Sequence, residues 1–521
     1  MDIKALRQKI LDLAIRGKLV PQDPNDEPAS VLLERIRAEK QQMVKDGKLK
    51  PKDIKNNTII FVGEDNLHYE KFQDGTVKCI EDEIPFELPE GWEWCRFTSV
   101  TVNRDSERKP ISSANRTNVA KIYDYYGASG KIDKIDKFIF NEKLLLIGED
   151  GANLVTRSKP IAFFAEGQYW VNNHAHCIDS TDKLILEYLC LYINAISLEK
   201  YVTGSAQPKM TQDNMNSILI ALPPYEEQKR LEFQVNHILK TVSTIENEKE
   251  DIVNYIISAK SKILDLAIRG KLVPQDSNDE PASVLLERIR AEKEELIKQG
   301  KIKRDKKESI IFKGDDNSYY EKVDDEVHCI DEELPFEIPK TWEWVRLQNC
   351  CTKEIRRGKS PKYTEQSNTL VFAQKCNTKY AGIDTGLALY LDESTLSKYS
   401  DDEYMQDGDI VVNSTGTGTL GRIGFYRNYD NNVMLPIVPD SHVTVIRACS
   451  SIQKFYLYIF MKANQHKLEK QGEGSTNQKE LKPLTLKNML VPIPPYSEQE
   501  RISAVITSAF SITSAIRRSL S

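Results

Sequence analysis

The chain has 521 residues, of which 40% are hydrophobic and 29% are charged. This length exceeds what one hydrophobic core accommodates, so we expect several domain-sized pieces. No apolar run reaches the roughly eighteen residues of a membrane-spanning helix, and the start MDIKALRQKI lacks the apolar stretch of a signal peptide; we therefore expect a cytoplasmic protein without a membrane partner. Nine cysteines without a CxxC pair argue against a disulfide framework and a structural zinc site.

The net charge of −6 does not decide whether the chain binds nucleic acid. Phosphate binding needs clustered Lys and Arg, and a net charge averages over the whole chain. Residues 98–204 contain 13 Lys and Arg against 13 Asp and Glu, and residues 348–473 contain 15 against 14. Both stretches are close to neutral, so a basic face would have to be formed by folding.

Three segments of the chain occur twice. LDLAIRGKLVPQDPNDEPASVLLERIRAEK at 11–40 returns at 264–293 with one change, CIEDEIPFELPEGWEW at 79–94 returns as CIDEELPFEIPKTWEW at 329–344, and PPYEEQKR at 223–230 returns as PPYSEQER at 494–501. The stretches 98–204 and 348–473 do not repeat. This alternation predicts a frame that holds two copies of one partner and carries two domains that bind different ligands.

The two ends of the chain complete the repeat. The C-terminal segment followed by the N-terminal segment matches the unbroken segment from Tyr225 to about Gly270. The protein is therefore predicted to be a two-fold repeat that is circularly permuted. Met1 and Ser521 are expected to lie close together.

The central segment has a heptad pattern of apolar residues, which predicts one coiled-coil helix of about 65 Å. Its predicted seam contains Leu231, Val235, Ile238, Val242, Ile245, Lys249, Ile252, Ile256, Ile263 and Leu266. The split copy continues this pattern with Ile502, Ile506 and Ile516 before the C-terminus. Lys249 interrupts the seam, where its side chain would either fix the register or extend toward solvent.

The predicted fold class is α+β, with two globular domains joined by a long antiparallel coiled coil of pseudo-two-fold, circularly permuted symmetry. We expect residues 1–20 and 496–521 to be the two halves of the split coiled-coil helix and residues 225–270 to be the continuous helix. The globular domains are expected at 21–224 and 271–495.

Two motifs of the repeated frame have structural interpretations. The WEW pairs, Trp92 with Trp94 and Trp342 with Trp344, have strand spacing, which favours a buried strand over base stacking. PASVLLERIRAEK predicts a helix whose apolar face either meets a partner protein or packs on its own domain. That face carries Leu32, Leu33 and Ile36, and its twin carries Leu285, Leu286 and Ile289.

In the first domain, GEDGANLVTRSK at 148–159 is a glycine-bearing loop before a strand. Its polar side chains suit base edges and phosphates, as do the basic residues near the start of the domain. The candidate DNA contacts are Asn153, Thr156, Arg157, Lys159, Arg104, Arg108 and Lys109, and a solvated loop is the alternative. His174 and His176 would share one face of a strand, but no third ligand of suitable spacing follows, so we expect hydrogen-bonded structural roles and no bound metal.

In the second domain, NSTGTGTLGRIGFY at 413–426 contains GxGxxG. The pattern predicts strand, glycine loop and strand, whereas dinucleotide binding requires a helix after the loop. We expect a tight hairpin that either contacts DNA or has no ligand. The candidate DNA contacts are Thr417, Thr419 and Arg422 in the loop, and Arg356, Arg357 and Lys359 near the start of the domain.

The two Pro-Pro-Tyr motifs argue against catalysis by this chain. Amino-methyltransferases resemble them but carry an Asn, Asp or Ser before Pro-Pro, which accepts the target amine. Leu222 and Ile493 occupy that position here and have no acceptor atom. We expect Pro-Pro to end a strand and the following Glu226, Glu227 and Glu498 to favour the start of a helix.

Together, the PPYEEQKR and PPYSEQER motifs, the twin LAIRGKLVPQD segments, GEDGANLVTRSKPIAFFAEGQYWVNNHAH and NSTGTGTLGRIGFY resemble the specificity subunit of a Type I restriction-modification enzyme over the whole chain. The resemblance implies that two target recognition domains each read half of a bipartite, asymmetric site in double-stranded DNA, while the coiled coil sets the gap. It also implies two modification subunits that methylate adenine with S-adenosylmethionine, and restriction subunits that cleave DNA. S-adenosylmethionine, ATP and Mg are expected on those partners and not on this chain.

Two other functions compete with this one. A self-sufficient methyltransferase is opposed by the missing acceptor before Pro-Pro-Tyr. A scaffold that binds two proteins through its unlike domains would be excluded by salt-dependent, sequence-dependent DNA binding, because phosphate contacts make affinity fall with salt.

Overall fold

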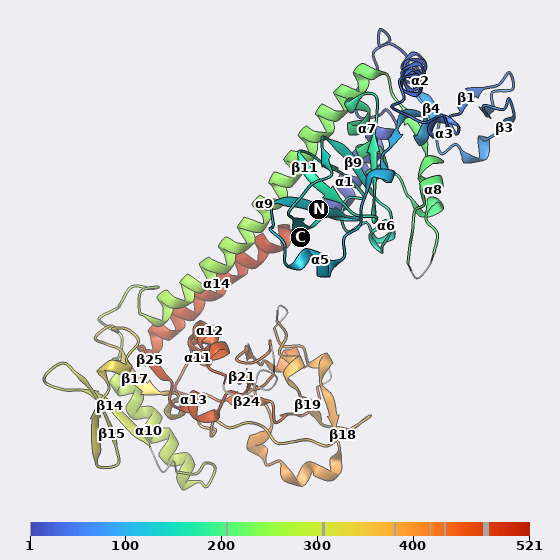
Figure 1. The fold of residues 1–521 in the computed structure, drawn as a ribbon. Coiled ribbons are helices and arrows are strands. Elements are labelled where there is room, and N and C mark those ends of the chain that lie inside the picture. The colour runs from blue at the N-terminus through green and yellow to red at the C-terminus, as the bar shows by residue number, and fades with distance from the viewer. Residues whose placement is uncertain are drawn as a thin grey trace. The chain divides into compact units, whose positions relative to one another are not determined.

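The computed structural model describes residues 2–204, 207–304, 308–379, 382–416, 418–431, 434–472 and 479–520. It divides into two compact units, Met1–Lys249 (unit 1) and Glu250–Ser521 (unit 2). Each unit mixes helices with β-sheets, and Figure 1 shows both, coloured along the chain. In the described part of the chain, no helix is long and apolar enough to cross a membrane.

Unit 1 contains four small sheets with helices packed against them. Its helices are α1 (Ile3–Ile15), α2 (Ala29–Lys45), α3 (Pro51–Ile54), α4 (Phe97–Val100), α5 (Ser113–Thr117), α6 (Asn153–Thr156), α7 (Lys183–Ala195), α8 (Gln212–Asn216) and the N-terminal part of α9 (Tyr225–Ile268). Its sheets, in spatial order, are β1 (Ile59–Val62), β2 (His68–Lys71) and β3 (Val77–Cys79); β13 (Leu219–Leu222) and β4 (Glu93–Arg96); β10 (Ala162–Ala165), β9 (Leu144–Gly148), β12 (Ala175–Asp179) and β5 (Val102–Asn103); and β7 (Gly130–Ile135), β6 (Tyr123–Gly127), β11 (Gln168–Val171) and β8 (Phe140–Asn141).

Unit 2 repeats this frame around a different domain. Its helices are the C-terminal part of α9, α10 (Ala282–Lys298), α11 (Lys454–Ala463), α12 (Gln465–Lys470), α13 (Pro483–Lys487) and α14 (Tyr496–Leu520). Its sheets are β14 (Ser309–Lys313), β15 (Tyr319–Val323) and β16 (Glu326–Cys329); β17 (Glu343–Arg346) and β25 (Leu490–Ile493); β18 (Tyr363–Thr364), β20 (Leu389–Leu391), β19 (Leu370–Phe372) and β23 (Ile437–Pro439); and β22 (Ile423–Phe425), β21 (Ile410–Asn413) and β24 (Val443–Ile446).

The boundaries of the long helices confirm the permuted repeat. α9 and α14 both begin at the Tyr that follows Pro-Pro, and α1 and α9 both end just before a repeated glycine. Gly17 and Gly270 have φ of 63° and 66°, a left-handed conformation that favours glycine at the end of a helix. A Cβ at either position would lie 2.4 Å from the Cγ of Pro89 or Pro339, so no larger residue fits.

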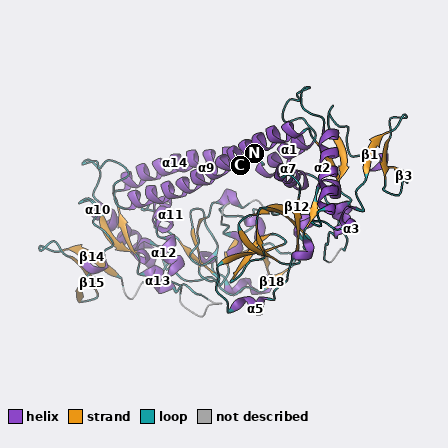
Figure 2. Ribbon diagram, turned by 45° about the horizontal axis from the view of Figure 1, so that its top comes forward, coloured by secondary structure: helices purple, strands orange, loops and turns teal. Residues whose placement is uncertain are grey.

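Each unit contains one antiparallel pair of long helices. In unit 1, Arg7 of α1 donates to Ser243 and Glu246 of α9, both at 2.9 Å, while Ile15 packs in the same cluster as Leu231. A later residue of α1 thus contacts an earlier residue of α9, so the two helices run antiparallel. In unit 2, Figure 2 shows α14 lying along α9. Lys260 contacts Ser514 at 3.5 Å, and Ile502 clusters with Leu264 and Ala267, which again gives an antiparallel pair.

The predicted seam residues differ widely in exposure. Six are buried: Leu231, Val235, Val242, Ile256, Ile502 and Ile506. Ile238, Lys249, Ile263 and Leu266 are half-buried. Ile245, Ile252 and Ile516 are 40%, 38% and 42% exposed. The chain ends Met1 and Ser521 lie outside the described residues.

The repeated frame packs inside its own unit. β4 pairs with β13 and β17 pairs with β25, and all four WEW tryptophans are buried, as predicted for a duplicated strand. The apolar face of α2 and α10 is also buried in its own unit, through Leu32, Ile36, Leu285, Leu286 and Ile289. The alternative that this face meets a partner protein is therefore wrong for these residues.

A buried carboxylate at the start of α9 and of α14 joins all three repeated segments. Glu227 accepts a hydrogen bond from the indole Nε1 of Trp92 at 2.9 Å and from Gln22 at 3.2 Å. In unit 2, Glu498 accepts from Trp342 at 2.9 Å and from Gln275 at 2.5 Å. Each glutamate is 1% exposed, and burial raises the pKa of both. We call this arrangement the helix-start network.

A second contact reinforces the helix-start network one turn further along each helix. Arg230 pairs with Asp26 at 2.5 Å, and Arg501 pairs with Asp279 at the same distance. The two units thus hold the first turn of their long helix by the same donors and acceptors, and the tryptophan and arginine contacts also have the same distances.

Removing the indole donor tests the helix-start network. Trp92→Phe keeps the aromatic ring but leaves the buried Glu227 with one donor fewer, so we expect unit 1 to lose about 1–3 kcal/mol of unfolding free energy. Chemical denaturation followed by circular dichroism measures this loss. Trp342→Phe is the matched variant and should destabilise unit 2 by a similar amount. Unchanged stability in both variants would contradict a structural role for the network.

Candidate nucleic-acid interface

In unit 1 the sheet that contains β9 is packed on both faces. Leu145 and Ile147 belong to the cluster that includes α7, whereas Leu144 and Leu146 pack against Tyr169 of β11. Side chains alternate between the faces of a strand, so a strand covered on both sides is apolar throughout. Polar side chains gather where β9 ends, at Glu149 and Asp150.

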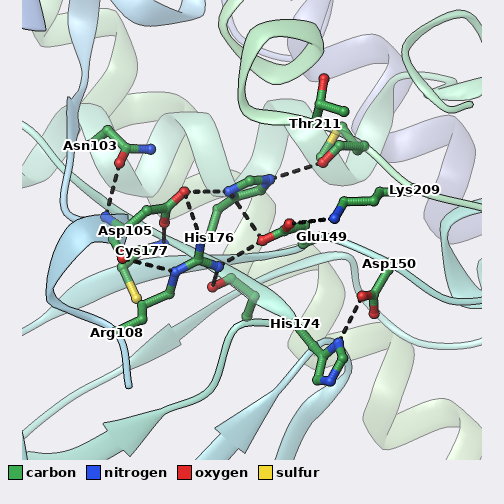
Figure 3. A network of polar contacts seen from close by, with 12 residues as sticks. Asn103, Asp105, Arg108, Glu149, Asp150, His174, His176, Cys177, Lys209 and Thr211 are labelled. Carbon is green, nitrogen blue, oxygen red and sulfur yellow. Dashed lines mark hydrogen bonds and ion pairs between the residues drawn. The ribbon is translucent and has the colours of Figure 1, made fainter. Parts of the chain in front are cut away.

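A network of buried polar groups lies at this end of the sheet (Figure 3). His176 of β12 is 1% exposed; its Nδ1 lies 2.6 Å from Asp105, and its Nε2 lies 3.0 Å from the carbonyl oxygen of Met210. Arg108 pairs with Asp105 at 3.2 Å and with Glu149 at 2.8 Å. The hydrogen-bonded structural role predicted for His176 is confirmed.

The charges of the network keep both carboxylates ionised. Burial alone would raise the pKa of Asp105 and Glu149. The hydrogen bond from His176 and the charge of Arg108 outweigh burial and lower the pKa of Asp105. For Glu149, the hydrogen bond from Arg108 and the nearby His176 and Lys209 lower the pKa in the same way. The network thus holds the segment before β6, the end of β9 and the segment at 209–210 in fixed positions.

Several of the predicted DNA contacts of the first domain form ion pairs or hydrogen bonds with other residues of the protein. Arg104 pairs with Glu107, Glu142 and Asp179. Arg157, at φ 52°, donates to the backbone carbonyls of Asn194, in the last turn of α7, and of Ile196, just after it, and burial lowers the pKa of Arg157.

The other candidates lie around the glycine-bearing loop. The side chain of Asn153 bonds to the backbone of Lys159, at 3.1 Å to the carbonyl oxygen and 3.0 Å to the nitrogen, and so closes the loop. Thr156, Lys159 and Lys109 are exposed, and neither lysine forms an ion pair with a described residue. His174 is also exposed and lies 2.7 Å from Asp150.

Unit 2 has the same strand arrangement with different polar groups. β21 pairs with β24 as β9 pairs with β12, and this register places Thr444 where unit 1 has His176, and Ser414 where it has Glu149. The Ser414 and Thr444 hydroxyls are 2.7 Å apart. His442 contacts Thr415 at 2.8 Å, in the place of the pair His174 and Asp150. One framework therefore carries a charged network in one domain and a neutral hydroxyl pair in the other.

The predicted contacts of the second domain are also engaged within the protein. Arg356 and Lys359 converge on Glu403, which is 2% exposed, and Arg357 pairs with Glu480. Burial alone would raise the pKa of Glu403, but the charges of Lys353, Arg356 and Lys359 outweigh burial and lower it.

The glycine loop of unit 2 forms the predicted hairpin, because β21 and β22 pair antiparallel. Arg422 donates to the carbonyl oxygens of Asn377 at 2.8 Å and Gly418 at 3.1 Å. Thr419 donates to the carbonyl oxygen of Thr415 at 3.1 Å. Thr417 lies outside the described residues. Among the residues that are described, no group of three or more His, Cys, Asp or Glu side chains could hold a metal ion.

The acidic members of these networks were not predicted from the sequence. Asp105, Glu149 and Glu403 give no local signal that distinguishes them from solvated acids. The one available signal is that Asp105 and Glu149 each stand beside a predicted basic contact or glycine loop. His176 is 71 positions from Asp105, Arg108 is 41 from Glu149, and Arg356 is 47 from Glu403, so only the fold brings these pairs together. Arg108, three positions from Asp105, is the one near partner among them.

The profile of the Type I restriction modification DNA specificity domain matches residues 89–259 and 339–520. This match covers more than half of the sequence, and the chain belongs to that family. It is a specificity subunit of the Type I restriction-modification class.

Curated relatives carry the same description. The Type I restriction enzyme EcoEI specificity subunit of Escherichia coli is 29% identical over 592 aligned residues, which cover 99% of this chain and 91% of the relative. The EcoAI specificity subunit of Escherichia coli is 32% identical over 418 residues, covering 66% of this chain and 62% of the relative.

Two solved structures are similar to this chain. A chain from a study of complex assembly in the type I R-M system aligns with a TM-score of 0.47 and 17% identity, covering 84% of this chain and 94% of that chain. The HsdS subunit from Thermoanaerobacter tengcongensis aligns with a TM-score of 0.38 and 17% identity, covering 84% and 93%.

The buried network makes the stability of unit 1 depend on pH. Because the folded pKa of Asp105 lies below its ordinary 3.8, the ionised group stabilises the fold above about pH 4, and this contribution is lost as the pH falls further. Asp105→Asn should therefore cost about 2 kcal/mol at pH 7, and the difference from wild type should shrink below pH 4. Chemical denaturation at several pH values measures both effects.

Asp150→Asn is the matched control, since its partner His174 is 47% exposed and such pairs contribute less than about 1 kcal/mol. An equal loss of stability in both variants, or a loss in Asp105→Asn that does not change with pH, would show that the charge of Asp105 is not what holds the network.

Proposed function

We propose that each unit of this specificity subunit reads one half of a bipartite, asymmetric site in double-stranded DNA. The observation that carries the proposal is the pair of matched sites. His176 and Glu149 in unit 1 occupy the same strand register as Thr444 and Ser414 in unit 2. Two similar scaffolds with unlike polar surroundings suit two different half-sites, and the family match supports DNA as the ligand.

The proposed reading surface is built from the loops at the carboxyl ends of β9 and β21. In unit 1 the loop after β9 presents the exposed Thr156 and Lys159, and the segment between β5 and β6 presents the exposed Lys109 next to Arg108, which is held by buried ion pairs. Exposed lysines contact phosphates and position the protein, whereas hydroxyl and amide groups read base edges. The paired arginines, such as Arg108, would act by holding the loops rather than by meeting DNA.

The chemistry is proposed to lie on partner subunits. Two copies of a modification subunit would methylate adenine with S-adenosylmethionine, and restriction subunits would use ATP and Mg to cleave DNA. The frame supports equal partners, because its helix-start networks are the same in both units. Leu222 and Ile493, which precede Pro-Pro, lie buried in β13 and β25 and offer no acceptor for a target amine.

The coiled-coil helices are proposed to set the gap between half-sites. Half-sites read from one face of DNA lie on the order of one helical turn apart, roughly 34 Å. A helix of 44 residues spans about 65 Å, so it is long enough to separate two reading domains by that distance.

A genome-wide map of N6-methyladenine, with and without this gene, tests the proposal. We expect a bipartite motif with an unspecified gap that disappears when the gene is deleted. A map that does not change in a host whose modification subunits are active would contradict the assignment. Binding of S-adenosylmethionine by the isolated chain would instead favour a self-sufficient methyltransferase.

Exchange of the unlike domains separates their roles. Replacing residues 98–204 with the corresponding domain of a relative should change one half-site and leave the other half-site and the gap unchanged. Inserting one heptad into the middle of α9 should have one of two results. Either the gap changes while both half-sites stay the same, or assembly is abolished and methylation is lost. Methylation mapping reads out both variants. A change in both half-sites on exchange of one domain would refute independent reading.

A further inference from the structure

The meander β1-β2-β3 in unit 1 and its counterpart β14-β15-β16 in unit 2 each have one face that their own unit does not cover. Figure 1 shows β1 and β3 standing apart from the other strands of unit 1. Both meanders lie outside the residues matched by the DNA specificity profile, 89–259 and 339–520.

The inner face of each meander is firmly held. Glu70 is 4% exposed and pairs with Arg96 of β4 at 2.7 Å, and Arg96 also pairs with Glu83 at 2.9 Å. In unit 2, Glu321 pairs with Arg346 at 2.5 Å, and Ile311 packs in the cluster of Trp344. Buried, bidentate ion pairs of this kind fix the orientation of the meander on its unit.

The outer face is exposed and largely apolar. Residues directly opposite in register share a face, which assigns Ile59, Phe61, Tyr69, Lys71, Val77 and Cys79 to the outer face in unit 1. Phe61 is 40% and Val77 51% exposed, and the rings of Phe61 and Tyr69 stack at 5.9 Å.

The outer face of unit 2 has the same residue at each of these six positions. In the same order they are Ile310, Phe312, Tyr320, Lys322, Val327 and Cys329. The geometry is also the same, since Phe312 is 40% and Val327 50% exposed and the Phe312 and Tyr320 rings stack at 5.9 Å. We call these two surfaces the twin faces.

Positions beside the twin faces differ between the repeats. Val62 corresponds to Lys313, Leu67 to Ser318, and His68 to Tyr319. The meander therefore accepts changes of polarity and size where side chains lie off the outer face. Burial within the chain does not explain why the two outer faces carry the same six residues, because these residues are exposed or half-buried. A common external contact explains it.

The charges around the twin faces indicate a protein and not DNA. Each meander runs directly into an acidic turn, with Glu81, Asp82 and Glu83 in unit 1 and Asp331, Glu332 and Glu333 in unit 2. Glu83 and Glu333 of these turns are held by the inner-face arginines Arg96 and Arg346. The six outer positions carry one lysine in each unit, Lys71 or Lys322, and not the cluster of cations that phosphate binding needs, so a largely apolar face of this kind suits a protein partner.

We propose that each twin face is a docking surface for one modification subunit, so that the chain binds two copies through identical contacts. This rests on the proposed function, which supplies a partner present in two equal copies. Two identical faces on one chain bind two identical partners, whereas the unlike DNA half-sites give no reason for the two faces to be identical. Phe61 and Phe312, aromatic and central in each face, are the anchors.

Charge substitutions at the anchors test the docking surface. Phe61→Glu should remove one of two modification subunits from the complex, and Phe61→Glu with Phe312→Glu should remove both, with affinity falling by at least about tenfold at each site. Native mass spectrometry of the full chain with the purified cognate modification subunit measures the stoichiometry, and titration calorimetry measures the affinity.

Val62→Lys and Leu67→Ser are the matched controls. Each introduces the residue that the other repeat already has at that position, so both variants should bind two modification subunits as the wild type does. Melting temperatures within about 2 °C of wild type show that the substitutions at exposed positions leave the fold intact.

The outcomes separate this inference from the proposed function. Wild-type stoichiometry and affinity in the double variant would overturn the docking surface while the assignment as specificity subunit stands. Loss of DNA binding with normal binding of the modification subunit would also overturn it, because the twin faces would then contact DNA. If the wild-type chain directs no methylation in the presence of the modification subunit, the proposed function itself fails.

Discussion

The structure depends on the buried carboxylates Glu227 and Glu498. Each sits at the first turn of a long helix, receives an indole N–H from the WEW segment and an amide from the LVPQD segment, and so joins three parts of the chain that are far apart in sequence. An ionised group in so buried a place is costly unless donors surround it, and this cost makes the geometry specific. Within each unit these few hydrogen bonds hold the first turn of α9 or α14 against the WEW strand and the LVPQD segment.

The frame was readable from the sequence because its signals are local or repeated. The heptad pattern predicted α9 within a few residues, Pro-Pro-Tyr predicted the starts of α9 and α14, and the comparison of repeats revealed the permutation. The polar sites were less predictable. Arg108 and Arg356 were recognised as basic residues of interest, but their partners Glu149 and Glu403 are brought to them by folds of the unlike domains. Side chains that far apart in the sequence are paired by tertiary packing, and no periodic pattern in the sequence indicates such a pair.

The two unlike domains show how one scaffold accepts opposite electrostatics. In unit 1, burial of Asp105 and Glu149 is compensated by Arg108 and His176, so a charged cluster is stable between apolar layers. In unit 2, Ser414 and Thr444 occupy the matching positions and satisfy each other as neutral hydroxyls. Both solutions leave no charge unpaired, which is the condition for burying polar groups. The exposed loops can therefore vary while the sheet beneath them keeps its register.

The exposure of α9 along its length bears on how the chain unfolds. Every residue of α9 is described, and between Val242 and Ile256 none is buried. The middle of the helix thus has little packing to hold it, although both ends are fastened within their own unit. Local opening has its lowest free energy where buried contacts are fewest. We therefore expect α9 to open first between Val242 and Ile256, before either end of the helix is released from its unit.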